Sequence, residues 1–239
     1  MTKAAALHDR DLLLNAAATV FRRSGFSAAT LRQVASAAGI RPGSLHYRYQ
    51  AKEDLLVDLM ERAMERLSAA VLSAVAATRD PAERLRLGLR AHLETLLSGD
   101  DSFYVLLYDF RSLEVGRARM IALRARYEEV WDRLLQEAVE AGLTRPGVDV
   151  ALLRQFGFGA MNWVVQWEDK SRSAGEIADA FWSYLALGLL REDRRRAFSR
   201  ARLGPSAKDG VVKFGRATKA RSLARSPARA GKATRKRRT

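Results

Sequence analysis

Apolar residues recur at three- and four-residue spacing along most of the 239-residue chain, a pattern typical of amphipathic helices. Glycine turns, the Asp80-Pro81 pair and the polar segments SGDDS and TRPG interrupt it. The pattern predicts helices near residues 9–24, 30–38, 42–49, 52–76, 82–97 and 102–110, a long stretch ending near 141, and then 148–168 and 175–193. Because no strand-like alternation or internal repeat stands out, we expect an all-α protein of about nine helices.

Three short helices at the N-terminus have the sequence form of a helix-turn-helix. Gly39 ends the second of them, where the turn requires a positive φ. Thr30 and Gln33 have the spacing of a capping box that begins this second helix, and Pro42 suits the first turn of the third. A small shared core is expected from three apolar residues, Val34, Ile40 and Leu45.

The segment AAATVFRRSGFSAATLRQVASAAGIRPGSLHYRYQAKEDLL, residues 16–56, resembles the DNA-binding domain of the TetR family of transcriptional regulators. The resemblance extends over 41 contiguous residues in register. Three positions depart from the family pattern: His46 replaces a tyrosine, Tyr49 a phenylalanine and Ala51 a small polar helix cap. The resemblance implies a ligand-responsive homodimer, most often a repressor that a small molecule releases from a pseudo-palindromic double-stranded DNA operator.

The resemblance also implies which side chains meet DNA, since arginine, serine and tyrosine hydrogen-bond base edges and phosphates. The expected major-groove set is Arg41, Pro42, Ser44 and Tyr47, with Arg32 reaching in from the preceding helix. The expected anchors to the phosphate backbone are Thr30, His46, Arg48 and Lys52. Because an imidazole donates from one nitrogen when neutral and from both when protonated, His46 is expected to make operator affinity depend on pH. The alternative is that Tyr47 and Tyr49 are core aromatics; for Tyr49, which fills an apolar position, we expect the core role.

Residues 53–202 are expected to form a ligand-binding and dimerisation domain. Aromatic side chains at helical spacing fit either a packed core or the walls of a cavity, and three of the four tryptophans close to an asparagine favour a cavity. The candidate ligand-binding residues are Tyr104, Tyr108, Arg124, Tyr127, Trp131, Asn162, Trp163 and Trp167.

Residues 156–190 carry a second, narrower resemblance. The order G-x-x-N-W-x-x-x-W, then a polar loop, then E-I-A before an apolar helix is similar to TetR relatives that respond to acyl-coenzyme A thioesters. It implies that Arg124, Arg126 or Arg111 pairs the anionic end of such a ligand, while Trp163 and Trp167 pack along its acyl or ring portion. A flat or linear apolar effector of another kind is the alternative.

The last two helices are also expected to form the dimer interface. Gly157 and Gly159 permit close helix approach, and an apolar stripe follows at helical spacing: Ile177, Phe181, Leu185 and Leu189. Two facing copies would form a four-helix bundle.

The formal net charge is +15, and the whole excess lies near the C-terminus. Residues 191–239 hold 18 Lys and Arg against 3 Asp and Glu, whereas residues 1–190 hold 24 of each. We therefore expect a helix-turn-helix DNA-binding domain over 1–52, the second domain over 53–202, and a disordered basic tail over 203–239 that raises non-specific DNA affinity. The tail also supports an alternative function, an architectural DNA-coating protein.

Other classes of protein find little support in the sequence. Cysteine is absent, and the histidines His8, His46 and His92 lie in three separate elements, so no metal set, cofactor site or His-paired nucleophile is visible. The segment GFGAMN lacks the preceding strand and third glycine of a dinucleotide-binding motif. Charges interrupt the N-terminus, and no apolar run approaches the ~20 residues of a membrane span. We expect a cytoplasmic protein that is not an enzyme.

Overall fold

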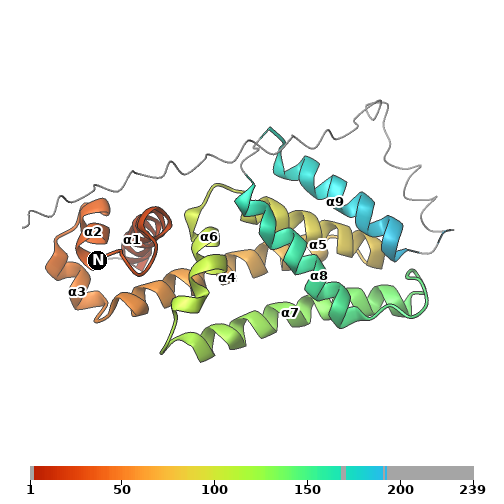
Figure 1. Ribbon diagram of the computed structural model, residues 1–239, viewed down its shortest axis with the longest axis horizontal. Helices are drawn as coiled ribbons and strands as arrows, with labels where there is room; N and C mark the ends of the chain where they lie inside the picture. The colour runs from red at the N-terminus through yellow and green to blue at the C-terminus, as the bar shows by residue number, and fades with distance from the viewer. Residues whose placement is uncertain (1–2, 168–170, 191, 193–239) are drawn as a thin grey trace, which may run out of the picture. The chain divides into compact units, whose positions relative to one another are not determined.

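The computed structural model describes residues 3–167, 171–190 and 192, and within them the predicted all-α fold is confirmed (Figure 1). The helices are α1 Lys3–Ser24, α2 Leu31–Ala37, α3 Pro42–Arg48, α4 Lys52–Val75, α5 Pro81–Leu96, α6 Asp101–Tyr108, α7 Arg117–Glu140, α8 Val150–Trp163 and α9 Ala174–Leu189. Two short 3-10 segments, η1 Asp109–Ser112 and η2 Val164–Gln166, follow α6 and α8. The predicted basic tail, 203–239, lies outside the described residues, and the boundaries between the three predicted domains stay predictions.

The N-terminal helices form for the local reasons that the sequence indicates. The Thr30 side chain accepts from the Gln33 backbone N–H, and the Gln33 side chain accepts from the Thr30 backbone N–H, which completes the capping box of α2. Gly39 has a φ of 67°, which permits the sharp turn into α3. Leu45 packs beneath α3 as predicted, but Ile40 is 37% exposed, because it follows directly on the turn glycine and points outside the three-helix core.

Two polar clusters fasten α1 and α3 to the first half of α4. Asp58 of α4 accepts hydrogen bonds from Arg10 of α1 and from the Tyr49 hydroxyl. Arg62, which is 6% exposed, donates to the Asp11 side chain at 3.1 Å and to the Asn15 side chain at 2.7 Å. These buried or half-buried charged groups therefore connect α4 to the helix-turn-helix domain.

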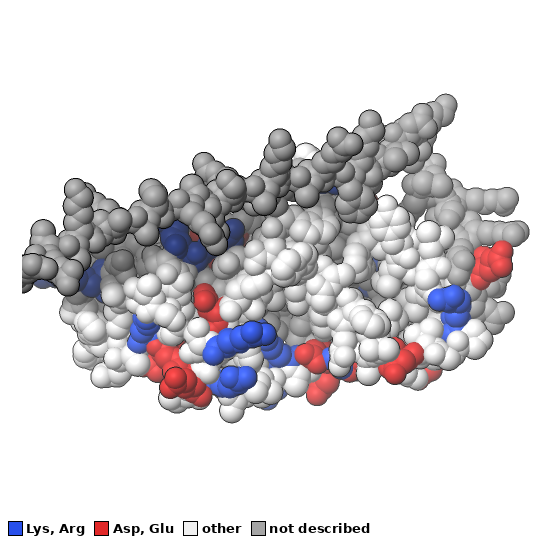
Figure 2. Space-filling view, viewed as in Figure 1, with Lys and Arg blue, Asp and Glu red and all other residues white. Residues whose placement is uncertain are grey.

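The larger bundle is built around α4 and α5, which pack against each other along their lengths. α9 packs on α5, α7 packs on α4, α5 and α8, and α6 lies between α1 and α4. On the face shown in Figure 2, basic and acidic side chains are interspersed along the edge that α7 forms, in agreement with the neutral charge balance of residues 1–190. Within the part of the chain that the structure describes, no helix has both the length and the apolar character to cross a membrane.

Both of the last helices end earlier than the apolar pattern predicts. α8 stops at Trp163 and tightens into η2, instead of continuing to residue 168. α9 stops at Leu189, because its end pairs with the TRPG turn: the Arg145 N–H donates to the Leu189 carbonyl at 3.0 Å, and Thr144 and Leu190 form an antiparallel bridge. Leu190, the C-cap residue of α9, accordingly has an extended backbone with φ −78° and ψ 152°.

Candidate DNA interface and ligand cavity

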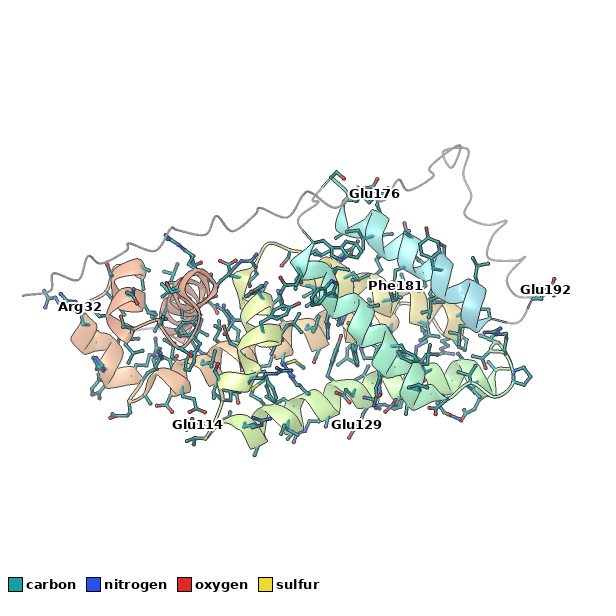
Figure 3. The ribbon with its side chains drawn as sticks, in the orientation of Figure 1. Arg32, Glu114, Glu129, Glu176, Phe181 and Glu192 are labelled. Carbon is teal, nitrogen blue, oxygen red and sulfur yellow. The ribbon has the colours of Figure 1, made fainter. Side chains whose placement is uncertain are left out.

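The predicted DNA-reading residues lie together on one exposed surface of α2, α3 and the turn between them. Tyr47 is 91% exposed, so it has no packing role within the protomer, whereas Tyr49 is 7% exposed and belongs to the core. The core interpretation is therefore wrong for Tyr47 and confirmed for Tyr49. The remaining exposed members of the predicted set are Thr30, Arg32, Arg41, Pro42, Ser44, His46 and Arg48. Arg32 extends from the outer end of the domain in Figure 3.

The charge of this surface has one sign. No acidic residue occurs between positions 27 and 50, and none of the three arginines in that range forms an ion pair with a carboxylate of the described residues. An exposed surface with several cations, a phenol and a hydroxyl fits a polyanion that also presents hydrogen-bonding base edges.

Two residues predicted to anchor DNA phosphates form hydrogen bonds within the protomer. The Lys52 ammonium donates to three backbone carbonyls of the loop after α1, those of Phe26, Ser27 and Ala29, at 2.6, 3.0 and 2.8 Å. These bonds use all three of its donors, so the prediction for Lys52 is corrected. Thr30 is exposed, but its hydroxyl is held within the capping box, where it also donates to the Gln33 side chain at 3.0 Å.

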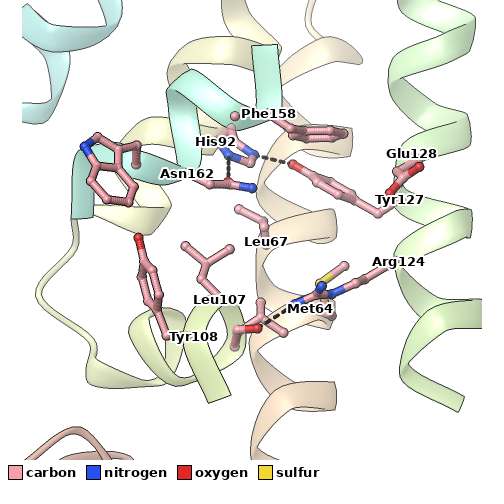
Figure 4. A pocket seen from close by; sticks show the side chains of 13 residues that line it. Met64, Leu67, His92, Leu107, Tyr108, Arg124, Tyr127, Glu128, Phe158 and Asn162 are labelled. Carbon is pink, nitrogen blue, oxygen red and sulfur yellow. Dashed lines mark hydrogen bonds between the residues drawn. The ribbon is translucent and has the colours of Figure 1, made fainter. Parts of the chain in front are cut away.

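A cavity of about 270 Å³ lies in the larger bundle between α4, α5, α6, α7 and α8 (Figure 4). Five of the predicted ligand-binding residues line it: Tyr108, Arg124, Tyr127, Asn162 and Trp163. Apolar side chains form most of the rest of the wall, and they are Met64, Leu67, Leu106, Leu107 and Phe158. Trp163 is 60% exposed, so it stands at the rim and not deep in the cavity.

The structure separates the other three predicted ligand residues from this cavity. Trp131 is 5% exposed and packs edge-on against Phe158, which makes it part of the core. Tyr104 and Trp167 line a different, more polar hollow together with Arg22 and Arg172. Helical spacing placed Tyr104 and Trp131 on the correct helices, whereas Trp167 lies beyond the end of α8. Spacing could not indicate which of these aromatics share one cavity.

His92, which the sequence did not indicate as a ligand-binding residue, is the most deeply buried polar group of the cavity wall. His92 is 1% exposed, and its ring nitrogens lie 2.7 Å from the Tyr127 hydroxyl (Nδ1) and 3.2 Å from Asn162 Oδ1 (Nε2). Burial lowers the pKa of His92 to about 4, against a smaller opposing effect of the hydrogen bond with Asn162, so the imidazole is neutral near pH 7. Its position in the Leu85, Leu89, Leu93, Leu96 stripe of α5 was the available signal.

Arg124 is held at the cavity by two contacts. Its guanidinium donates to the Leu106 carbonyl at 2.7 Å and lies 3.9 Å from the centroid of the Phe110 ring. Burial lowers the pKa of Arg124, while the nearby Glu128 carboxylate opposes that effect. Glu128 forms its ion pair with Arg154, so among the residues lining the cavity Arg124 is the cation available to an anionic group.

The apolar stripe predicted on α9 for the dimer interface packs, wholly or in part, on the protomer's own core. Phe181 and Leu185 border a void of about 30 Å³ together with Leu85 and Leu89 of α5, and Leu189 is 3% exposed. Ile177 packs against the same core, and Gly157 borders the same void. The physical reason is that α9 needs this stripe to pack on α5.

A different set of apolar side chains on α8 and α9 is exposed. This set, the outer apolar face, consists of Leu152, Phe156 and Trp163 of α8 and Tyr184 and Leu187 of α9, with exposed fractions of 46, 68, 60, 67 and 55%. On α8, Phe156 lies four positions after Leu152, and Trp163 lies seven positions after Phe156, with the exposed Gly159 between them. The three apolar residues therefore form one stripe.

Comparison with known proteins agrees with this architecture. Residues 13–59 match the model of the bacterial regulatory proteins of the tetR family, and residues 78–189 match that of a tetracyclin repressor-like C-terminal domain. The HTH-type transcriptional repressor KstR2 of Mycobacterium tuberculosis is 30% identical over 162 residues, which are 66% of this chain and 80% of KstR2.

Solved structures show the same fold. The TetR family transcriptional regulator PfmR from Thermus thermophilus is 31% identical with a TM-score of 0.68, over 75% of this chain and 99% of PfmR. AibR in complex with isovaleryl coenzyme A and operator DNA has a TM-score of 0.68 at 24% identity, over 74% of this chain and 97% of AibR. The exposed helix-turn-helix, the larger helical bundle and these matches together assign the chain to the TetR family of DNA-binding transcriptional regulators.

Proposed function

We propose that this chain is a dimeric repressor that leaves a pseudo-palindromic operator when a small, largely apolar effector, an acyl-coenzyme A thioester, binds the cavity of the larger bundle. The observation that carries the proposal is the cavity itself, because a mostly apolar space with a few convergent polar groups is the usual form of a small-molecule site. Its position beside α4 and α6 connects it to the helices that hold the helix-turn-helix.

The DNA-binding part of the proposal assigns the exposed surface of α2 and α3 to the operator. Arg41, Ser44 and Tyr47 would meet base edges in the major groove, with Arg32 beside them. Arg48 and His46 would meet phosphates. The absence of acidic residues between positions 27 and 50 supports this assignment, because no carboxylate there would repel the DNA backbone.

The effector part rests on the size and lining of the cavity. At about 270 Å³ it lies just below the ~300–1,000 Å³ of sites that enclose a drug-sized ligand, so it would hold an acyl or ring portion and leave a larger headgroup outside. Trp163 at the rim would pack against the emerging part of the ligand, and Arg124 would pair an anionic group. The fold relative AibR was crystallised with isovaleryl coenzyme A, a ligand of this shape.

The proposed dimer interface is the outer apolar face. Large exposed apolar side chains that form one stripe are typical of an interaction site. Gly159 lies within the stripe with no atom within 4 Å of an added Cβ, so a partner helix could approach it closely. Two copies joined here would present two helix-turn-helix units to a symmetric operator.

A competition experiment tests the proposal. The full chain is titrated against a duplex selected from a random pool and against unselected duplex, at one stated salt concentration, with fluorescence anisotropy as the readout. We expect a preference of ~10³ or more for the selected palindrome, and loss of that preference when an acyl-coenzyme A is added. A preference near one would instead support the DNA-coating alternative, which no comparison favours.

Matched variants then test the assigned surface. Arg41→Ala is expected to weaken operator binding by about 1–3 kcal/mol, the usual contribution of a specific arginine contact. Arg133→Ala removes an exposed arginine of α7, far from α3 in sequence, and is expected to leave operator affinity unchanged. Equal effects of the two changes would contradict the DNA-reading role of α3.

A further inference from the structure

A chain of three polar side chains leads from the core into the cavity (Figure 4). Tyr127 of α7, which is 5% exposed, contacts His92 of α5, and His92 contacts Asn162 of α8. The three residues come from three helices, and the His92 ring is enclosed by aromatic rings: Tyr127 is stacked on it, and Trp131 and Phe158 lie within 6 Å of its centroid. Each partner in this chain is therefore fixed by packing as well as by hydrogen bonds.

The protons of this chain have one consistent arrangement. Burial raises the pKa of Tyr127 well above its usual range, so its hydroxyl keeps its proton, with a smaller opposite effect of the Trp131 indole, which is only a donor. The described residues offer this hydroxyl no hydrogen-bond acceptor other than His92 Nδ1. The hydroxyl therefore donates to Nδ1, and a neutral imidazole that accepts at Nδ1 carries its own proton on Nε2.

The proton on Nε2 decides the orientation of the Asn162 amide. His92 Nε2–H donates to Asn162 Oδ1, so the amide oxygen is occupied and the NH₂ group points the other way. Figure 4 shows the Asn162 nitrogen directed away from His92, on the side of Leu67. No hydrogen bond to a described residue uses that nitrogen, and the neighbouring wall is apolar. The amide thus presents unused hydrogen-bond donors to whatever fills the cavity.

We infer that Asn162 is the residue that recognises a carbonyl oxygen of the effector, and that His92 and Tyr127 are positioning residues that hold its amide with the donor inward. The inference rests on the proposed function and makes it narrower: the ligand is apolar around a carbonyl acceptor, as a thioester is, and the carbonyl lies inside the cavity.

Two matched ligands test the inference on the unaltered protein. Isovaleryl-coenzyme A and S-isopentyl-coenzyme A, its thioether, differ only in the carbonyl oxygen. Leaving a buried amide donor unsatisfied costs ~1–3 kcal/mol, so the thioester is expected to bind about 5- to 150-fold more tightly in calorimetric titration. Equal affinity of the two compounds overturns the inference and leaves the proposed effector class standing. Binding of neither compound overturns the proposed effector class, and the inference with it.

Variants then separate recognition from structure. Asn162→Leu is expected to equalise the two affinities, while Gln136→Leu, the same change on α7 outside the cavity, keeps the wild-type ratio. Tyr127→Phe removes only the hydroxyl. His92 can then change its tautomer and the Asn162 amide can rotate by 180°, so the ratio of thioester to thioether affinity is expected to fall toward one. In the wild type, ¹⁵N spectra are expected to show His92 protonated at Nε2. Protonation at Nδ1 instead, or an unchanged ratio in Tyr127→Phe, would overturn the positioning role.

Discussion

Replacement of Gly116 by alanine is expected to destabilise the junction between α7 and α4. Gly116 precedes α7 with a φ of −78°, so its backbone would accept any residue. Space excludes a side chain: a Cβ atom here would lie 2.2 Å from Cγ2 of Val57, whereas ordinary contacts are 3.4–4 Å. The same loop is bound to α4 through Glu53, whose carboxylate accepts from the backbone N–H groups of Glu114 at 2.7 Å and Gly116 at 3.0 Å.

The overlap sets the size of the effect. Overpacking of this kind costs ~1–3 kcal/mol, and each kcal/mol lowers Tm by about 2–4 °C in a chain of this length. Val57→Ala alone would lose about 1 kcal/mol of apolar burial. In the double variant the clash is absent. Its loss of stability is therefore expected to be smaller than the sum of the two single-variant losses, by a coupling of at least ~1 kcal/mol. A small part of the loss, from a poorer N-cap residue, would remain.

Thermal unfolding followed by circular dichroism measures all of these quantities, with Gly43→Ala as the control. A Cβ at Gly43 meets nothing within 4 Å, and alanine is the better helix former, so Tm is expected to stay the same or rise. An unchanged Tm in Gly116→Ala would refute the reasoning. So would strictly additive losses in the double variant, because the clash with Val57 is the stated cause.

Three further changes test other contacts. Burial alone would raise the pKa of Asp58, but the hydrogen bonds that its carboxylate accepts lower that pKa below its ordinary value. The contribution of Asp58 to stability is therefore present above pH ~4 and is lost as the pH falls through the lower, folded-state pKa. Unfolding measured between pH 6 and 3 is expected to show a steeper loss in the wild type than in Asp58→Asn, and parallel curves would contradict the assignment. Phe156→Arg on the outer apolar face is expected to give monomers in sedimentation velocity, whereas Val115→Arg, at a residue that is 90% exposed elsewhere, leaves the dimer intact. Lys52→Met is expected to lose ~1.5–3 kcal/mol of stability, the usual size for a hydrogen bond to a charged group, without changing the slope of log affinity against log salt; a slope reduced by about one would restore its predicted phosphate contact.

The helix-turn-helix could be predicted almost completely from the sequence, because local interactions determine it. The Thr30 capping box, the positive φ at Gly39 and proline at the first position of α3 each act within a few residues, and all three are present in the structure. Lys52 was misassigned for the opposite reason. Its partners are carbonyls more than twenty residues earlier in the chain, and the sequence around Lys52 contains no sign of them.

The ligand cavity was predicted only in part, since its wall depends on how five helices meet. Tyr108, Tyr127 and Asn162 line the cavity, as their helical spacing in the sequence predicts. Trp131 has the same periodicity and is a core residue. His92 could not be chosen from the sequence, because a histidine in a leucine stripe gives no indication of whether a tyrosine and an asparagine on two other helices will reach it.

Which apolar side of α8 and α9 packs on the protomer's own core could not be predicted from the sequence, for a more general reason. A helix with a single apolar side buries that side in the core, but α8 and α9 are apolar on more than one side. On α8, Met161 is 4% exposed while Phe156 and Trp163 are at least 60% exposed, and on α9 Leu189 is 3% exposed while Tyr184 is 67% exposed. Hydrophobicity alone does not distinguish these faces. The packing of α9 on α5 covers the stripe that is most regular in the sequence and leaves exposed the less regular one, which is rich in aromatic side chains.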